Sequence, residues 1–361
     1  MVDYSQENTT LSNNVYRDLQ IYLDTMSMGF PPTASGIELR ILQKLFSEKD
    51  ARMFLSLTAE LKTPEDIAAR LNCDTAELAA HLQDMRDRGL LFSIKKGDVT
   101  KYGIISYMHG IYEFQLTRMD KEFAEMAGQY FDEAFSQAIL ASASSFARTI
   151  PVRESLDAKC TIAAFEDAAQ IMRSQKTISV AECICRKEKS MVGKGCSKPR
   201  EVCFMFGSMG AYYIENGLGR QVDADEAIRL LAEAQKAGLV TQPSTAQNPG
   251  GLCNCCGDCC GILRALNLTD KPAKQVTANY YAAVDKNSCV GCELCLDRCQ
   301  VHALTMKENL AEINLDRCIG CGLCVIACPS ASIRMVPKEK QAVLPLGTME
   351  QMVQMAKARG L

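Results

Sequence analysis

The sequence predicts an α+β protein of several domains, and three observations support this. The chain has 361 residues, 47% hydrophobic and 23% charged, which is typical of folded rather than disordered protein and long enough for two or three domains. Residues 1–157 combine helical patterns with a hairpin and hold one of the 19 cysteines. Residues 158–270 hold ten cysteines in a mixed pattern, and residues 277–338 hold eight in a repeated pattern. These differences divide the chain into an N-terminal, a central and a C-terminal part.

Charge and cysteine spacing exclude several classes of protein. The 40 basic and 43 acidic side chains leave a formal charge of −3, which argues against a general polyanion binder. Many cysteines are two residues apart, a spacing that favours metal chemistry in a reducing compartment over a disulfide framework. Residues 1–10 lack a secretory signal pattern, and no run approaches the ~18 apolar residues of a membrane span. We therefore expect a soluble, cytoplasmic protein without a membrane span.

The N-terminal part, residues 1–110, is predicted to contain helices followed by a β-hairpin. Apolar periodicity predicts helices over 37–46, 47–60, 63–71 and 74–88, and alternation predicts strands over 91–94 and 99–105. Ser47 and Thr63 are expected N-caps, Pro64 a first helical residue and Gly89 a helix end. Helices followed by a hairpin in this order resemble a winged helix-turn-helix domain. Residues 111–157 are expected to link domains through a long amphipathic helix over 123–146.

The central part, residues 158–270, is predicted to be a mixed α/β domain. Helices are expected over 161–174 and from Asp223, the N-cap of a helix that runs to about residue 236. The polar segment 242–251 is expected to be a loop, and Lys271 and Pro272 begin a linker. Residues 339–361 form a tail with a predicted Met-rich helix over 349–357, capped by Thr348.

The C-terminal part, residues 277–338, carries a duplicated cysteine motif. Each cysteine of the second run lies 29 positions after its counterpart in the first. The two runs are Cys289, Cys292, Cys295 and Cys299, and Cys318, Cys321, Cys324 and Cys328. Three cysteines, each separated from the next by two residues, can place their thiolates around one iron–sulfur cubane. A fourth cysteine, after three intervening residues, points away and reaches another cluster.

This pattern resembles the bacterial two-[4Fe–4S], or dicluster, ferredoxin family. The resemblance implies a pseudo-symmetric fold with two [4Fe–4S] clusters. It implies that one cluster is ligated by Cys289, Cys292, Cys295 and Cys328. It implies that the other is ligated by Cys318, Cys321, Cys324 and Cys299. Structural zinc or disulfides are the alternative, but eight cysteines in a repeated pattern exceed what a zinc ribbon requires.

Small residues agree with this resemblance, and one residue departs from it. Gly291 and Gly320 lie inside the cysteine loops, where backbone amides approach the sulfides. Runs of this family usually end in Cys-Pro, as Cys328 and Pro329 do, but Gln300 follows Cys299. Because proline fixes the exit angle of the chain, we expect Gln300 to alter local hydrogen bonding.

The central cysteines form a second constellation. They are Cys183, Cys185, Cys196, Cys203, Cys253, Cys255, Cys256, Cys259 and Cys260. They resemble a cysteine-rich domain found beside dicluster ferredoxin domains in proteins of anaerobes, a resemblance that assigns no ligands. A further iron–sulfur cluster is the favoured interpretation, with zinc and a thiol or disulfide redox site as alternatives.

The remaining candidate residues are not expected to bind metal or to catalyse a reaction. Solitary Cys73 and Cys160 are expected to be buried small hydrophobes. The three histidines, His81, His109 and His302, have no partner spacing that indicates a metal pair or a nucleophile, so we expect structural or surface roles. Basic residues between Cys185 and Cys203 either dock an acidic redox partner or line a solvated loop. They are Lys187, Lys189, Lys194, Lys198 and Arg200.

The charge of the predicted helix 74–88 argues against DNA recognition. A winged helix places this helix in the groove, yet four acidic residues outnumber Arg86 and Arg88 on it. The predicted wing does carry Lys95, Lys96 and Lys101. We expect an interaction or dimerisation module that supports a homo-oligomer, rather than a DNA reader.

Three functional hypotheses follow. The first is an electron-transfer protein that relays single electrons between protein redox partners through two [4Fe–4S] clusters and a third in the central part. The second is an iron–sulfur redox-sensing DNA-binding regulator. The third is an oxidoreductase with its active site among the central cysteines.

Overall fold

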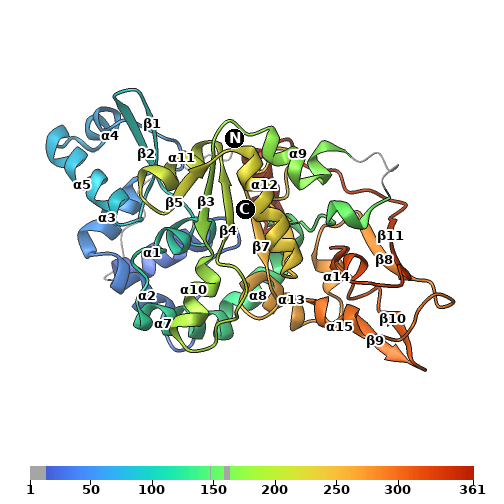
Figure 1. The fold of residues 1–361 in the computed structure, drawn as a ribbon. Coiled ribbons are helices and arrows are strands. Elements are labelled where there is room, and N and C mark those ends of the chain that lie inside the picture. Colours follow the sequence, from blue (N-terminus) through green and yellow to red (C-terminus); the bar gives the residue numbers. More distant parts are fainter. Residues whose placement is uncertain (1–13, 147, 158–162) are drawn as a thin grey trace.

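The computed structural model describes residues 14–146, 148–157 and 163–361. Figure 1 shows the N-terminal helices at one end, the central sheet in the middle and the C-terminal strands at the other end. Cys160 and the start of the predicted helix 161–174 lie outside the described residues.

Within the described residues 14–110, the N-terminal part contains five helices and a hairpin. The elements are α1 (Val15–Asp24), α2 (Ile37–Leu45), α3 (Glu48–Ser56), α4 (Pro64–Leu71), α5 (Thr75–Asp87), β1 (Phe92–Lys96) and β2 (Val99–Gly103). The predicted caps are confirmed: Ser47 with Asp50 and Thr63 with Asp66 form capping boxes. Gly89 has a φ of +72° after the end of α5, as the predicted helix end requires. The order from α2 to β2 is the predicted one, whereas α1 was not predicted, and the assignment to a winged helix remains a prediction.

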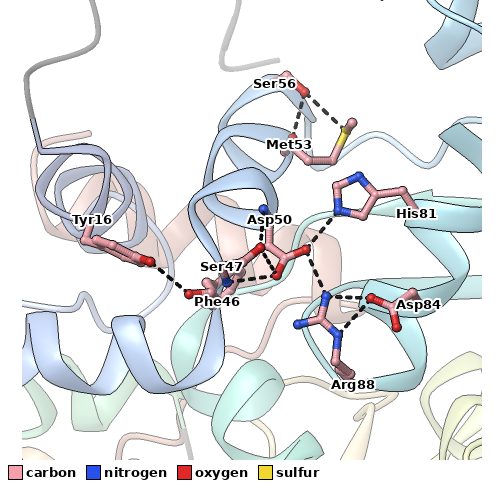
Figure 2. Close-up of polar contacts among 9 residues, drawn as sticks. All are labelled: Tyr16, Phe46, Ser47, Asp50, Met53, Ser56, His81, Asp84 and Arg88. Atoms are coloured by element: carbon pink, nitrogen blue, oxygen red, sulfur yellow. Dashed lines mark hydrogen bonds and ion pairs between the residues drawn. The ribbon is translucent and has the colours of Figure 1, made fainter. Parts of the chain in front are cut away.

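Asp50 holds α3 and α5 together (Figure 2). Its carboxylate accepts hydrogen bonds from Ser47 N at 2.9 Å and from Arg88 Nη2 at 2.8 Å, and lies 2.9 Å from His81 Nε2. Burial alone would raise the pKa of Asp50, but its bonds to Arg88, Ser47 and His81 outweigh burial and hold this pKa well below its ordinary value. His81 therefore has the structural role that the sequence predicts.

The predicted helix 123–146 is present with an irregularity. It consists of α7 (Lys121–Tyr130), a π-type turn (Phe131–Phe135) and α8 (Ser136–Phe146). Before it, α6 (Tyr112–Phe114) follows the irregular segment Tyr107–Ile111, in which His109 has a φ of +58°.

The central part is an antiparallel sheet with strand order β5-β3-β4-β7-β6. The strands are β3 (Ile178–Glu182), β4 (Glu201–Phe206), β5 (Gly219–Val222), β6 (Val240–Pro243) and β7 (Gly251–Cys255). The helices are α9 (Ala168–Arg173), α10 (Ile184–Met191), α11 (Gly207–Glu215), α12 (Ala224–Lys236) and α13 (Gly261–Asn267). Asp223 caps α12 as predicted. Two predictions are corrected: α9 is shorter than predicted, because a 3₁₀ turn (Ala164–Glu166) precedes it, and pairing with β7 extends β6 into the predicted loop.

The C-terminal part consists of two sheets of two strands and short helices. Its elements are α14 (Pro272–Gln275), β8 (Tyr280–Val284), α15 (Leu294–Arg298), β9 (Leu304–Lys307), β10 (Leu310–Ile313), α16 (Leu323–Ile326), β11 (Ile333–Pro337) and α17 (Thr348–Ala358). The antiparallel pairs β8–β11 and β9–β10 join the first half of the repeat to the second. Thr348 is the first residue of α17 rather than its cap, because Gly347 occupies the N-cap position. Among the described helices, none has the length and apolar character needed to cross a membrane.

The N-terminal and central parts pack against each other through a shared apolar core and through polar contacts. Arg86 Nη2 lies 3.0 Å from Glu215 Oε2, and Tyr212 Oη donates to Leu91 O at 2.9 Å. Phe114 stacks on Tyr212 with ring centroids 4.2 Å apart. These contacts place the N-terminal helices beside the cysteine-bearing side of the sheet.

Candidate metal centres

The eight C-terminal cysteines line two separate hollows. The first hollow, of about 290 Å³ of protein-free space, is lined by Cys289, Cys292, Cys295 and Cys328. The second, of about 360 Å³, is lined by Cys299, Cys318, Cys321 and Cys324. Each hollow thus receives three cysteines from one run and the fourth from the other run. These are the two sets that the resemblance implies, and their role as ligands remains a prediction.

Backbone amides and hydroxyl groups point at the sulfur atoms of both hollows. Ala303 N donates to Cys299 Sγ at 3.1 Å, and Ala282 N donates to Cys318 Sγ at 3.5 Å. In the first hollow, Ser332 Oγ lies 3.2 Å from Cys328 Sγ. Hydrogen bonds of this kind stabilise thiolates and tune the potential of a cluster that they hold.

The two hollows differ in how easily their thiols ionise. A hydrogen bond from the Ala311 backbone, with another from Gly291, lowers the pKa of Cys289. Burial would raise the pKa of Cys328, but bonds from the Ser332 and Ser330 hydroxyls and from backbone N–H groups outweigh it and lower this pKa to about 7.

In the second hollow, burial dominates. It raises the pKa of Cys321 to about 12, and it also raises the pKa values of Cys318 and Cys324. Thiolates in such a place need a cationic partner, which the irons of a cluster supply. The residues of both hollows therefore fit [4Fe–4S] clusters.

Glycines allow the chain to close tightly around both hollows. A Cβ on Gly291 would lie 2.5 Å from Asn309 O, and one on Gly320 would lie 2.2 Å from Tyr280 O. Both residues have a φ of +69°, in the left-handed region that glycine adopts without strain. Equivalent glycines in the two halves therefore meet equivalent constraints, as a duplicated unit requires.

The central cysteines separate into two groups. Six of them form a continuous series of neighbouring thiols, in which the ionisation of each is affected by the next. In order, this six-thiol group is Cys185, Cys183, Cys203, Cys253, Cys255 and Cys260. Cys203 and Cys253 come from the adjacent strands β4 and β7, and the others flank α10 and α13. The group therefore depends on segments that the sheet brings together.

The other three cysteines, Cys196, Cys256 and Cys259, form a compact three-thiol group. Their sulfur atoms all lie within 4.8 Å of one another, and Cys196 Sγ and Cys256 Sγ are 3.8 Å apart. Cys256 and Cys259 are buried and Cys196 is half-buried. Cys183 packs in the same apolar cluster and adjoins both groups.

A buried guanidinium lies between the two groups. The Arg186 side chain is 1% exposed, and its Nη2 donates to Asn254 O at 3.0 Å. Its Nε and Nη1 have no hydrogen-bond partner among the described residues. Its charge interacts with Cys183, Cys256, Cys255 and Cys203. Because a buried charge needs compensation, this arginine indicates that the neighbouring sulfurs are anionic.

Sequence reasoning missed one side chain at the six-thiol group. His109 lies beside Cys253 and packs on Phe146 at a centroid distance of 4.1 Å. Interactions with Cys203 and Cys255, and with His109, hold the pKa of Cys253 below its ordinary value. His109 is 144 residues away from Cys253 in the chain, so no local spacing could have indicated this contact.

Two other expectations have a definite outcome. Cys73 is exposed, so the prediction that it is buried is wrong. It follows the C-cap residue Asn72 of α4, at a turn that leaves its side chain in solvent.

The basic loop is largely engaged within the chain, because Lys187, Lys198 and Arg200 all contact described residues. Arg200, for example, binds Glu182 and the Ser190 hydroxyl.

Comparison with known proteins identifies one region. The family model of the 4Fe-4S dicluster domain matches residues 288–332, which carry both cysteine runs. No curated protein and no solved structure matches the chain. Residues 288–332 therefore match a 4Fe-4S dicluster domain, and this match, with the many cysteines, supports an iron–sulfur electron-transfer role.

Proposed function

We propose that this protein relays single electrons between protein redox partners through two [4Fe–4S] clusters and a third iron–sulfur cluster. The observation that supports this proposal most directly is the pair of hollows, each lined by four cysteines drawn from both runs. Cys289, Cys292, Cys295 and Cys328 would hold one cluster, and Cys299, Cys318, Cys321 and Cys324 the other. When bound, such clusters supply one-electron redox chemistry. The thiol-rich composition is proposed to reflect a reducing compartment such as the cytoplasm.

The environments of the hollows support a direction for the relay. The first hollow adjoins the exposed Cys292 and Val290, which is 68% exposed, so it is accessible to a partner protein. The second hollow faces the rest of the chain, where Val152 N donates to Cys321 O at 3.0 Å. We infer that a partner exchanges electrons at the first hollow and that the second hollow adjoins the internal side.

Gln300 joins the second hollow to the central cysteines. It directly follows Cys299, and its Oε1 accepts a hydrogen bond from Gly257 N at 2.8 Å. Gly257 directly follows Cys256 of the three-thiol group. The residue that departs from the Cys-Pro pattern therefore makes the contact between the two cysteine-rich parts.

We propose that the six-thiol group holds the third iron–sulfur cluster. Three of its cysteines are buried and three are half-buried, and the group lies beside the cation of Arg186, which would offset the negative charge of thiolate-bound iron. His109 at Cys253 is the specific observation that favours a second function, an oxidoreductase active site at this group. Perturbation of a cluster spectrum by an added substrate would distinguish such an active site from a simple relay.

The N-terminal part is proposed to be an interaction module rather than a DNA reader. Arg88 contacts Asp50 and Asp84, and Arg86 contacts Glu215, so the basic residues of α5 are neutralised within the chain. The hairpin residues Lys95 and Lys96 are exposed. A gel shift at low salt is expected to show no retardation of DNA in either redox state.

Iron and acid-labile sulfide per chain test the proposed function. Anaerobically purified protein is expected to contain about 8 irons from the dicluster domain and further iron from the central part. Reduction should produce interacting cluster signals in low-temperature EPR, and Cys255→Ser should remove only the additional iron. A preparation without iron and sulfide after anaerobic reconstitution would refute the relay.

A further inference from the structure

The spacing of Cys196, Cys256 and Cys259 matches a single metal ion rather than a cubane. With metal–sulfur bonds of about 2.3 Å, the thiolates of a tetrahedral site are about 3.8 Å apart. Around a cubane of four irons, the ligating thiolates are roughly 6 Å apart. The observed 3.8 Å between Cys196 Sγ and Cys256 Sγ, with all three sulfurs within 4.8 Å, agrees with the tetrahedral site.

We propose that Cys196, Cys256 and Cys259 hold one zinc ion, at a site separate from every iron–sulfur cluster of this protein. Zinc favours tetrahedral coordination by thiolates and undergoes no redox change. The fourth position would be taken by a water molecule, because Cys183 packs in the same apolar cluster but is not among the sulfurs that lie within 4.8 Å of one another. The central part would then hold two centres of different chemistry, zinc in the three-thiol group and iron in the six-thiol group.

Charge balance at the site supports a bound cation. Three thiolates and one divalent ion carry a net charge of −1, and the Arg186 guanidinium that interacts with Cys256 carries +1. Without the ion, three thiols would leave that buried guanidinium without an anion for its free Nε and Nη1 groups. A disulfide would not account for this arrangement, because it bonds two sulfurs at about 2.05 Å and leaves the third sulfur without a partner.

The location of the site gives the ion a positioning role. Cys196 lies in the loop between α10 and β4, whereas Cys256 and Cys259 lie between β7 and α13. The ion would pin these two loops together and hold Gly257, whose N–H donates to Gln300. It would therefore fix the surface on which the dicluster domain docks.

Element analysis of the full chain tests the site. Protein produced anaerobically with both iron and zinc supplied is expected to contain one zinc per chain. Cys259→Ser and Cys256→Ser should lose this zinc and keep the iron and sulfide of the wild type. The exposed Cys73→Ser is the matched control and should change neither metal. Cys255→Ser should lose iron and keep zinc, so failure of the third cluster and failure of the zinc site are distinguishable.

X-ray absorption at the zinc edge requires no variant and covers the case in which a serine variant does not fold. The wild-type protein is expected to show three sulfur neighbours at about 2.3 Å and one lighter neighbour from water. Absence of stoichiometric zinc from the wild type would overturn the proposal. So would loss of about four irons from Cys259→Ser, because these thiols would then ligate a cubane.

Discussion

Replacing Gly320 with alanine should empty the second hollow selectively. Gly320 has a φ of +69°, and a Cβ there would lie 2.2 Å from the carbonyl oxygen of Tyr280. Tyr280 is the first residue of β8, and Ala282 of the same strand donates to Cys318 Sγ. The strand would have to move away, and this movement would withdraw the hydrogen bond from the sulfur.

Two contributions set the magnitude of this effect. Alanine in the left-handed region costs roughly 1–2 kcal/mol. Displacement of packed backbone by the new methyl group adds about 1–3 kcal/mol. Gly217→Ala is the matched control, because Gly217 has a φ of +65° and nothing within 4 Å of the added Cβ, so it carries the first contribution alone.

Iron content and unfolding of the anaerobic protein measure both contributions. Gly320→Ala is expected to lose roughly four irons per chain and to unfold at lower denaturant concentration than Gly217→Ala. Gly291→Ala should do the same to the first hollow, because its Cβ would meet Asn309 O at 2.5 Å. The reasoning is refuted if Gly320→Ala and Gly217→Ala keep the same iron and unfold together.

Three further predictions concern polar contacts. Gln300→Leu leaves the Gly257 N–H without its acceptor, which should destabilise the protein by about 1–3 kcal/mol. It should also slow electron exchange between the dicluster and central centres, measured by freeze-quench EPR, without changing the iron content. An unaltered rate would exclude Gln300 from the electron-transfer path. Arg186→Met removes the buried cation and should deplete metal in the central part while the ~8 irons of the dicluster domain remain; full metal retention would contradict the charge argument. Asp50→Asn should destabilise the protein by about 3 kcal/mol at pH 7. Folding lowers the pKa of Asp50, so its carboxylate contributes to the free energy of unfolding above the ordinary pKa of about 4, and this contribution is lost as the pH falls below that value. The stabilities of wild type and variant should therefore converge in acid. A stability difference that stays constant between pH 7 and pH 3 would argue against this reasoning.

Helix caps and the duplicated cysteine motif could be predicted from the sequence, because each depends on a short segment of chain. Ser47 and Thr63 are N-caps as predicted, and each forms a capping box with a residue three positions later. The repeated cysteine spacing indicated a dicluster domain, and the family model matches that segment. Such features depend on backbone geometry within one or two turns of chain, so they need no knowledge of distant packing.

Only the tertiary structure decided how the central cysteines divide. Cys253, Cys255 and Cys256 are almost adjacent in sequence, yet alternation along β7 and the turn after it direct them to different groups. Their partners Cys203 and Cys196 come from about fifty residues earlier, through pairing of β4 with β7. The approach of His109 to Cys253 and of Gln300 to Gly257 likewise joins segments far apart in the chain. Sequence patterns determine which side chains can ligate metal, whereas strand pairing and docking determine which of them share a site, because these long-range contacts have no local signature.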